Sequence, residues 1–221
     1  MKIIEFRKSV IYLPFFIFLI AFSTGCSTAY YGAMEKIGIH KRDILVDRVE
    51  DARDAQTEAQ EQFKSALEQF GSVIQLENTD LKAAYEKLNS EYEDSEEAAK
   101  NVSDRIDRVE SVADALFREW EDELGLYKSV ELKNQSSKQL RATKARYNKM
   151  LQSMRQAESS MTPVLQTFRD NVLFLKHNLN AQAIGSLRTE FKNLEGEINR
   201  LITKMNIAIE TSNHFINNLE K

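Results

Sequence analysis

Hydrophobic side chains recur at alternating steps of three and four residues along residues 45–73, 81–120 and 184–219. A seven-residue repeat gives an α-helix one continuous apolar face and favours left-handed supercoiling against partner helices. Residues 140–179 carry a broader, less regular apolar stripe. The pattern therefore predicts long helices that pack along apolar seams. The positions of the first seam are Leu45, Val49, Ala52, Gln56, Ala59, Phe63, Ala66, Phe70 and Val73.

Breaks in the repeat divide the chain into four predicted helices. Residues 78–80 are candidate N-caps for the second helix, and Ser137 is the candidate N-cap of the third. Pro163 would kink the third helix or restart it. Residues 178–185 form the last candidate break. The predicted helices span about 40–74, 79–127, 137–179 and 182–219.

Four helices of similar length with short connections favour an all-α fold, an elongated antiparallel bundle or coiled coil. A rival arrangement is two long hairpins that pair with another protomer. The chain has only 7 Gly and 2 Pro, fewer turn residues than sheet architectures need. No linker interrupts residues 40–221, which we assign to one helical bundle domain. Gln56 and Ser95 fall in apolar seams, where a polar residue can fix the register of the helices.

The N-terminal segment resembles a bacterial lipoprotein signal. A basic start is followed by the apolar residues 10–22, which are too few to span a hydrocarbon core of about 30 Å as a relaxed helix. Small residues then precede Cys26, the single cysteine. The resemblance implies a signal peptide over residues 1–25, lipidation at Cys26 and a lipidated linker over residues 26–39. An ordinary secretory signal with a free thiol, or a signal-anchor helix, are the alternatives.

Charge is divided unequally along the chain. Residues 40–127 contain 11 Lys+Arg and 24 Asp+Glu, whereas residues 128–221 contain 15 and 8. One interpretation is helix pairing, in which Arg141, Lys144 and Arg146 face the acidic residues 119–122 across a hairpin turn. The other is an anionic partner, lipid or cell-wall polymer, bound by residues 128–155. The candidate binding residues are Lys138, Arg141, Lys144, Arg146 and Lys149.

Motifs for catalysis or cofactor binding are missing from the sequence. None of the three histidines belongs to an HExxH motif or to the Glu-x-x-His pairs of di-iron bundles. The glycines form no phosphate-binding loop, and no GxSxG nucleophile elbow is present. The acidic residues 91–97 lack the glycine turn of an EF-hand loop. We therefore expect no enzyme activity, no metal, no cofactor and no small-molecule substrate.

Residues 30–56, which begin Tyr-Tyr-Gly-Ala-Met-Glu-Lys-Ile-Gly-Ile-His-Lys-Arg-Asp, resemble the start of a family of bacterial lipoproteins catalogued as domain of unknown function 2959. This resemblance implies a helical envelope lipoprotein of Gram-negative bacteria and no particular activity. Ser27, rather than Asp, follows Cys26, which by resemblance to lipoprotein sorting implies an outer-membrane anchor facing the periplasm.

We expect a non-enzymatic structural or adaptor module, tethered to the membrane and engaging other envelope proteins or itself. The alternative is a membrane-surface or cell-wall binding module that uses residues 128–155. An acidic, exported chain is a poor candidate for binding nucleic acid.

Overall fold

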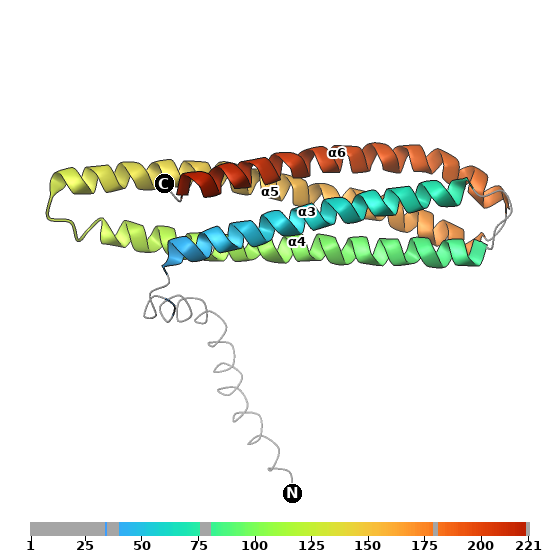
Figure 1. Cartoon of the computed structure of the whole chain (residues 1–221), viewed down its shortest axis with the longest axis horizontal. Coiled ribbons are helices and arrows are strands. Elements are labelled where there is room, and N and C mark those ends of the chain that lie inside the picture. Colours follow the sequence, from blue (N-terminus) through green and yellow to red (C-terminus); the bar gives the residue numbers. More distant parts are fainter. Residues whose placement is uncertain (1–33, 35–39, 76–80, 179–180, 220–221) are drawn as a thin grey trace, which may run out of the picture.

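The computed structural model describes residue 34 and residues 40–75, 81–178 and 181–219. These described residues form helices and connecting turns, with no strand among them. The long helices are α3 (Lys41–Ile74), α4 (Leu81–Glu123), α5 (Val130–His177) and α6 (Ala181–Leu219). They run antiparallel, side by side, in an elongated bundle (Figure 1). Helix α3 packs against α4 and α6, and α5 packs against the same two helices. The predicted all-α antiparallel bundle is confirmed, and its core closes within one chain.

The helices differ in length, and α4 and α5 are the two longest. Helix α5 has 48 residues and α3 has 34, which at about 1.5 Å per residue correspond to about 70 Å and 50 Å. The connection between α4 and α5 projects beyond the first residue of α3 and the last residue of α6 (Figure 1). We call this projecting part, residues 120–136, the hairpin end.

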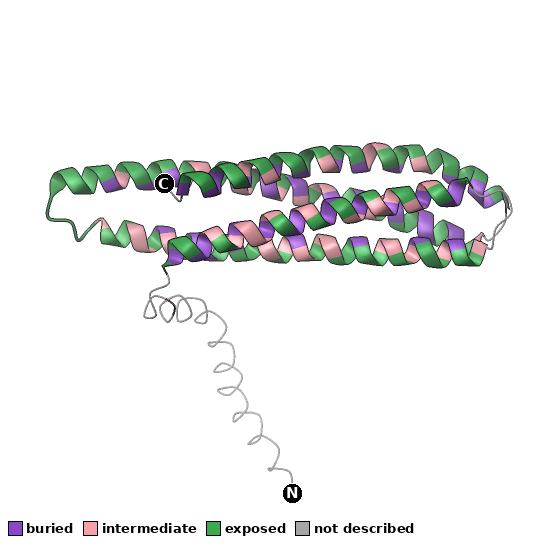
Figure 2. Ribbon diagram, viewed as in Figure 1, coloured by how far each residue is buried: buried purple, intermediate pink, exposed green. Residues whose placement is uncertain are grey.

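The predicted seams form most of the core. Every position of the first seam is buried, and the seam in α6 is buried except at Phe191, which is half-buried. Figure 2 shows the buried positions of the bundle interleaved with exposed ones along each helix. In α4 the seam is less accurate, because Tyr85 and Tyr92 are half-buried whereas Ala84 and Val112, outside the predicted repeat, are buried. In a helix of 3.6 residues per turn, positions seven residues apart are rotated by about 20° around the helix axis. Over several heptads, the positions of a strict seven-residue repeat therefore rotate away from the face that is buried.

The predicted start of the third helix is wrong. Helix α5 begins at Val130, and its N-cap is Ser129, whose Oγ accepts a hydrogen bond from the Leu132 backbone N–H at 3.3 Å. Ser137 lies inside the helix, where its Oγ accepts a hydrogen bond from Arg141 at 2.7 Å. The polar run before Ser137 suggested a turn, but most of it lies on the solvent-facing side of the helix.

Two other predicted breaks are helical. Helix α5 continues through Pro163, whose ring lies on the exposed face. A proline removes the hydrogen bond to the carbonyl of residue Ser159, and Ser159 is also exposed, so water can take the place of the missing donor. Gly185 lies inside α6, since the break ends at Ala181. The candidate caps at residues 78–80 lie outside the described residues.

Candidate functional site

Of the residues that the structure describes, those at the hairpin end form the densest group of exposed apolar side chains. Helix α4 ends with hydrogen bonds from the Leu124 and Leu126 backbone N–H groups to the carbonyls of Trp120 and Glu123. Beyond this turn, α5 begins without a neighbouring third helix to cover it (Figure 1). The exposed fractions are 80% for Leu126, 42% for Tyr127, 73% for Val130 and 54% for Leu132. We call residues 126–132 the apolar tip.

Aromatic contacts join the hairpin end to the bundle. The Trp120 indole N–H donates a hydrogen bond to Ser136 Oγ at 2.8 Å, which links α4 to α5. One turn further into the bundle, the Phe117 ring meets the Tyr147 ring edge-on at 5.3 Å, and Tyr147 in turn contacts Phe215 of α6 at 6.2 Å. Burial, with smaller contributions from nearby carboxylates, raises the pKa of the Tyr147 phenol well above its ordinary value. Tyr147 is therefore a neutral core residue.

Only one of the three predicted cross-hairpin cations pairs with the acidic end of α4. Lys144 Nζ contacts Glu121 Oε1 at 2.5 Å and also lies 5.4 Å from the centre of the Phe117 ring. Arg146 donates to Thr143 Oγ1, its neighbour on the same helix, at 3.2 Å. Arg141 donates to the serine one turn before it. The helix-pairing interpretation is thus correct for Lys144 and wrong for Arg141 and Arg146.

Glu119, predicted to face α5, pairs instead with α3. Lys41 Nζ contacts Glu119 Oε1 at 2.9 Å, and the lysine side chain is 10% exposed. This contact holds the first residue of α3 one turn before the end of α4. It follows that the chain enters the bundle beside the hairpin end.

A cluster of ion pairs between α4 and α5 lies deeper in the bundle. Arg155 contacts Asp107, Glu110 and Glu158, with Nη2–Oδ1 and Nη1–Oε2 distances of 2.6 Å and 2.8 Å to Asp107 and Glu158. Partial burial would lower the pKa of the Arg155 guanidinium, but hydrogen bonds to these three carboxylates raise it above its ordinary value. Arg155 therefore aligns α5 on α4 and is not available to a partner.

The remaining cations of the predicted basic segment face solvent. Lys138, Arg141 and Lys149 are exposed, and none of them forms an ion pair with a described residue. They lie on the side of α5 that faces away from the buried positions Leu140 and Tyr147. This part of α5 presents positive charge that no acidic side chain of the described chain neutralises.

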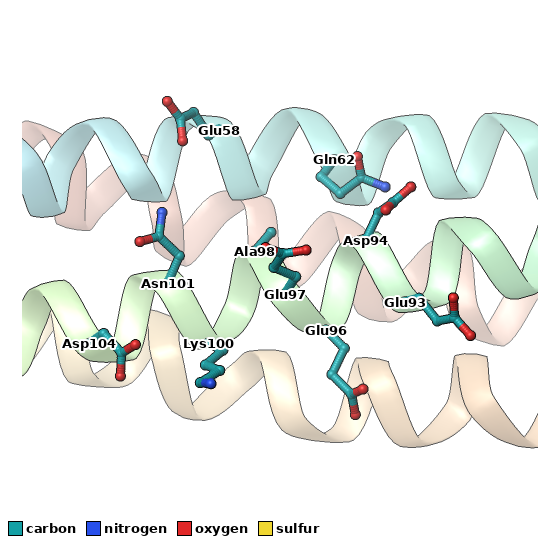
Figure 3. Close-up of a pocket in the computed structure, with 10 residues that line it drawn as sticks. All are labelled: Glu58, Gln62, Glu93, Asp94, Glu96, Glu97, Ala98, Lys100, Asn101 and Asp104. Atoms are coloured by element: carbon teal, nitrogen blue, oxygen red, sulfur yellow. The ribbon is translucent and has the colours of Figure 1, made fainter.

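Acidic side chains line a groove of about 1010 Å³ between α3 and α4. The lining residues are Glu58, Gln62, Glu93, Asp94, Glu96, Glu97, Ala98, Lys100, Asn101 and Asp104. Figure 3 shows Glu96, Lys100 and Asp104 directed to the side of α4 away from α3, so the carboxylates diverge. Among the described residues no group of three or more His, Cys, Asp or Glu side chains is placed to hold a metal ion. The divergence is that of a solvated helix face.

The apolar tip was not predicted from the sequence. Its residues fall between two seams, where the heptad pattern carries no information, and the predicted basic segment 128–155 drew attention to charge at this place and not to its apolar side chains. An available signal was the run Leu126-Tyr127 directly after Gly125, because two large apolar residues in a turn have no helix face on which to be buried. Cys26, the predicted lipidation site, lies outside the described residues.

None of the helices in the described part of the chain combines the length and the apolar composition that a membrane crossing requires. No curated protein and no solved structure matches the chain significantly. One family of proteins matches residues 30–219, which include all four long helices. The chain therefore belongs to this family, described as protein of unknown function DUF2959.

Proposed function

We propose that this protein is a non-enzymatic lipoprotein of the cell envelope, held in the outer membrane through Cys26 and facing the periplasm. Its bundle would act as a rigid structural or adaptor module for other envelope proteins or for a second copy. The observation that carries this proposal is a single core that continues along all four helices of an elongated bundle entered at one end.

The attachment at one end gives the bundle its use as a spacer. Lys41 is the fifteenth residue after Cys26, a span of at most about 50 Å when fully extended. From Lys41, helix α3 carries the chain about 50 Å to the opposite end of the bundle. Since packed interiors resist deformation, the far end would keep a fixed position relative to the entry point. A module of this kind would hold a bound partner at a fixed distance from the anchor and would catalyse no reaction.

Lipidation at Cys26 is the first testable part. Mass spectrometry of the N-terminal peptide from the membrane fraction should show a chain that begins at Cys26 and carries acyl groups. Cys26→Ser should leave the precursor uncut or the protein unanchored, because no other cysteine is present to be acylated. An unmodified Cys26, or a membrane-bound chain that retains residues 1–25, would exclude the lipoprotein proposal. The adaptor role is tested separately: crosslinking in cells followed by mass spectrometry should identify the envelope protein, or the second copy, that the bundle contacts.

A second candidate function is attachment to an anionic surface, either lipid headgroups or a cell-wall polymer. It is favoured by one observation, the exposure of Lys138, Arg141 and Lys149 without acidic partners in the described chain. Cations that do not pair within the protein remain available to phosphate or carboxylate groups of a partner. This candidate and the adaptor role are compatible, because the basic side chains lie in the half of α5 nearest the hairpin end.

Charge reversal distinguishes cations that stabilise the fold from cations that can bind an anionic partner. The triple variant Lys138→Glu, Arg141→Glu and Lys149→Glu should unfold in urea within about 0.5 kcal/mol per site of the parent, as exposed substitutions usually do. It should also lose salt-sensitive binding to phosphatidylglycerol vesicles or to isolated cell wall. Lys144→Glu is the matched control and should lower the free energy of unfolding by about 1 kcal/mol or less. If the triple variant binds both surfaces like the parent, this second candidate is wrong.

A further inference from the structure

The apolar tip has the chemistry of a bilayer contact. We propose that residues 126–132 insert their apolar side chains into the interface of the same membrane that holds the Cys26 lipid, which makes the tip a second attachment point beside the lipid. This inference rests on the proposed lipid anchor for the identity of the membrane. It assigns a binding surface to side chains that the core does not use.

The exposed apolar side chains are concentrated at this place. Seven large hydrophobic residues are strongly exposed in the described part of the chain, and four of them, Leu126, Tyr127, Val130 and Leu132, lie within seven consecutive residues. The other three are Leu173, Phe174 and Ile207, on the helices. Scattered exposed apolar residues are normal, but a contiguous group at the end of a projecting hairpin indicates a contact surface.

The position of the tip agrees with the position of the anchor. Lys41 pairs with Glu119, so the chain that leads back to Cys26 joins the bundle at the base of the hairpin end. The tip begins at Leu126, seven residues beyond Glu119, and only the first four of these residues belong to α4. Met34 packs against the core, so the eight-residue step from Cys26 to Met34, at most about 28 Å, keeps the bundle close to the membrane surface in an anchored chain.

The composition of the tip favours a bilayer over a second copy or a polymer. Four side chains at no more than about 150 Å² each would bury at most about 600 Å² on the tip, less than the roughly 800 Å² per partner of a standard protein interface. Lys128 and Lys133 are exposed among the apolar side chains and form no ion pair with a described residue, so their charge can stay at the headgroups while their stems lie along apolar surface. Tyrosine, here Tyr127, is enriched at the interface of membranes. A cell-wall polymer offers no comparable apolar phase.

Two attachment points would change how the bundle sits on the membrane. An anchor at a single point does not by itself fix the orientation of a rod relative to the membrane. With the apolar tip inserted as well, the rod is held by its end, and the opposite end is directed away from the bilayer. The tip thus supplies the orientation that the proposed adaptor role requires.

A single-cysteine label tests the position of the tip directly. The chain from residue 26 onward with Cys26→Ser has no thiol and retains every described core residue, so a fluorophore can be placed at Leu126→Cys or, as a matched control, at Leu173→Cys. Leu173 is also exposed, at 41%, but lies near the opposite end of α5. An N-terminal hexahistidine on nickel-chelating lipid replaces the native anchor on vesicles of phosphatidylcholine and phosphatidylglycerol.

The expected result is a blue-shifted label at position 126 that brominated acyl chains quench, and an unshifted, unquenched label at position 173. Without the tether, Val130→Ser with Leu132→Ser should weaken vesicle binding at least about tenfold, whereas Leu173→Ser with Phe174→Ser should leave it unchanged. Both double variants should keep the melting temperature of the parent, because all four side chains are exposed.

Three outcomes would overturn the inference. The label at position 126 is not quenched on tethered vesicles, or both labels are quenched equally, or the label at position 126 responds to protein concentration without vesicles, which would identify a second copy as the partner. None of these measurements depends on native acylation. An absent acyl group at Cys26 in cells would therefore refute the anchor while leaving the bilayer affinity of the tip to be decided separately.

Discussion

Replacing Phe168 with alanine is expected to lower the free energy of unfolding by about 3–5 kcal/mol, the usual loss for a phenylalanine removed from a packed core. The Phe168 side chain is fully buried in α5. Its ring lies 6.3 Å from the Phe70 ring of α3 and meets the Tyr92 ring of α4 edge-on at 6.0 Å. The substitution therefore opens a cavity between three helices at once, where no single helix can move to fill it.

A control for this effect is available on the same helix. Phe174, six residues further along α5, is 39% exposed, so Phe174→Ala removes a similar volume without opening an internal cavity. Urea unfolding followed by far-ultraviolet circular dichroism should show a large decrease in the transition midpoint for Phe168→Ala and a change near 0.5 kcal/mol or less for Phe174→Ala. Equal effects of the two substitutions would contradict the packing described for the core.

The fold was predictable from the sequence because its information is local and periodic. An apolar residue at each third or fourth position selects one face of a helix, whatever that face packs against, and the first seam from Leu45 to Val73 is buried throughout. The start of α5 was not predictable to the same accuracy. Both Ser129 and Ser137 can act as N-caps, and the cap forms at Ser129. Ser136, beside the second candidate, contacts Trp120 of another helix, a tertiary interaction that a local pattern does not contain.

The candidate site was less predictable than the fold, because it depends on how the helices are offset. The acidic residues at the end of α4 and the basic residues at the start of α5 are near one another in any hairpin, yet Glu119 pairs with Lys41 of α3. The offset of neighbouring helices along their axes determines which long charged side chains come close enough to pair. Each exposed pair contributes only about 0–1 kcal/mol, so the pairs do not determine that offset. The projection of the apolar tip beyond α3 and α6 follows from the same offset.

Replacing Gln56 with leucine is expected to stabilise the protein. Its side chain is fully buried in α3, and neither its amide nitrogen nor its amide oxygen has a hydrogen-bond partner among the described residues. An unsatisfied buried polar group costs about 1–3 kcal/mol. Gln56→Leu should therefore raise the free energy of unfolding by about this amount.

Gln60, one turn further along α3, is the matched control. Its amide donates to Asn206 Oδ1 at 2.8 Å and lies 3.4 Å from the carbonyl oxygen of Ile202, both on α6. Gln60→Leu removes these contacts and should lower the free energy of unfolding by about 0.5–1.5 kcal/mol, the net contribution of a typical hydrogen bond. Urea unfolding of both variants compares the same Gln-to-Leu substitution at two positions of one helix, one with and one without hydrogen-bond partners.

The two outcomes for Gln56 have different physical meanings. A polar residue in an apolar seam can fix the register of neighbouring helices at a cost in stability. A stabilised Gln56→Leu variant with additional amide resonances, or with a mixture of species in sedimentation velocity, would assign that role to Gln56. A stabilised variant with one well-ordered state would mean that the neighbouring apolar side chains alone define the register. A destabilised variant would show that the amide is hydrogen-bonded to buried water in solution, since only a satisfied polar group is costly to remove.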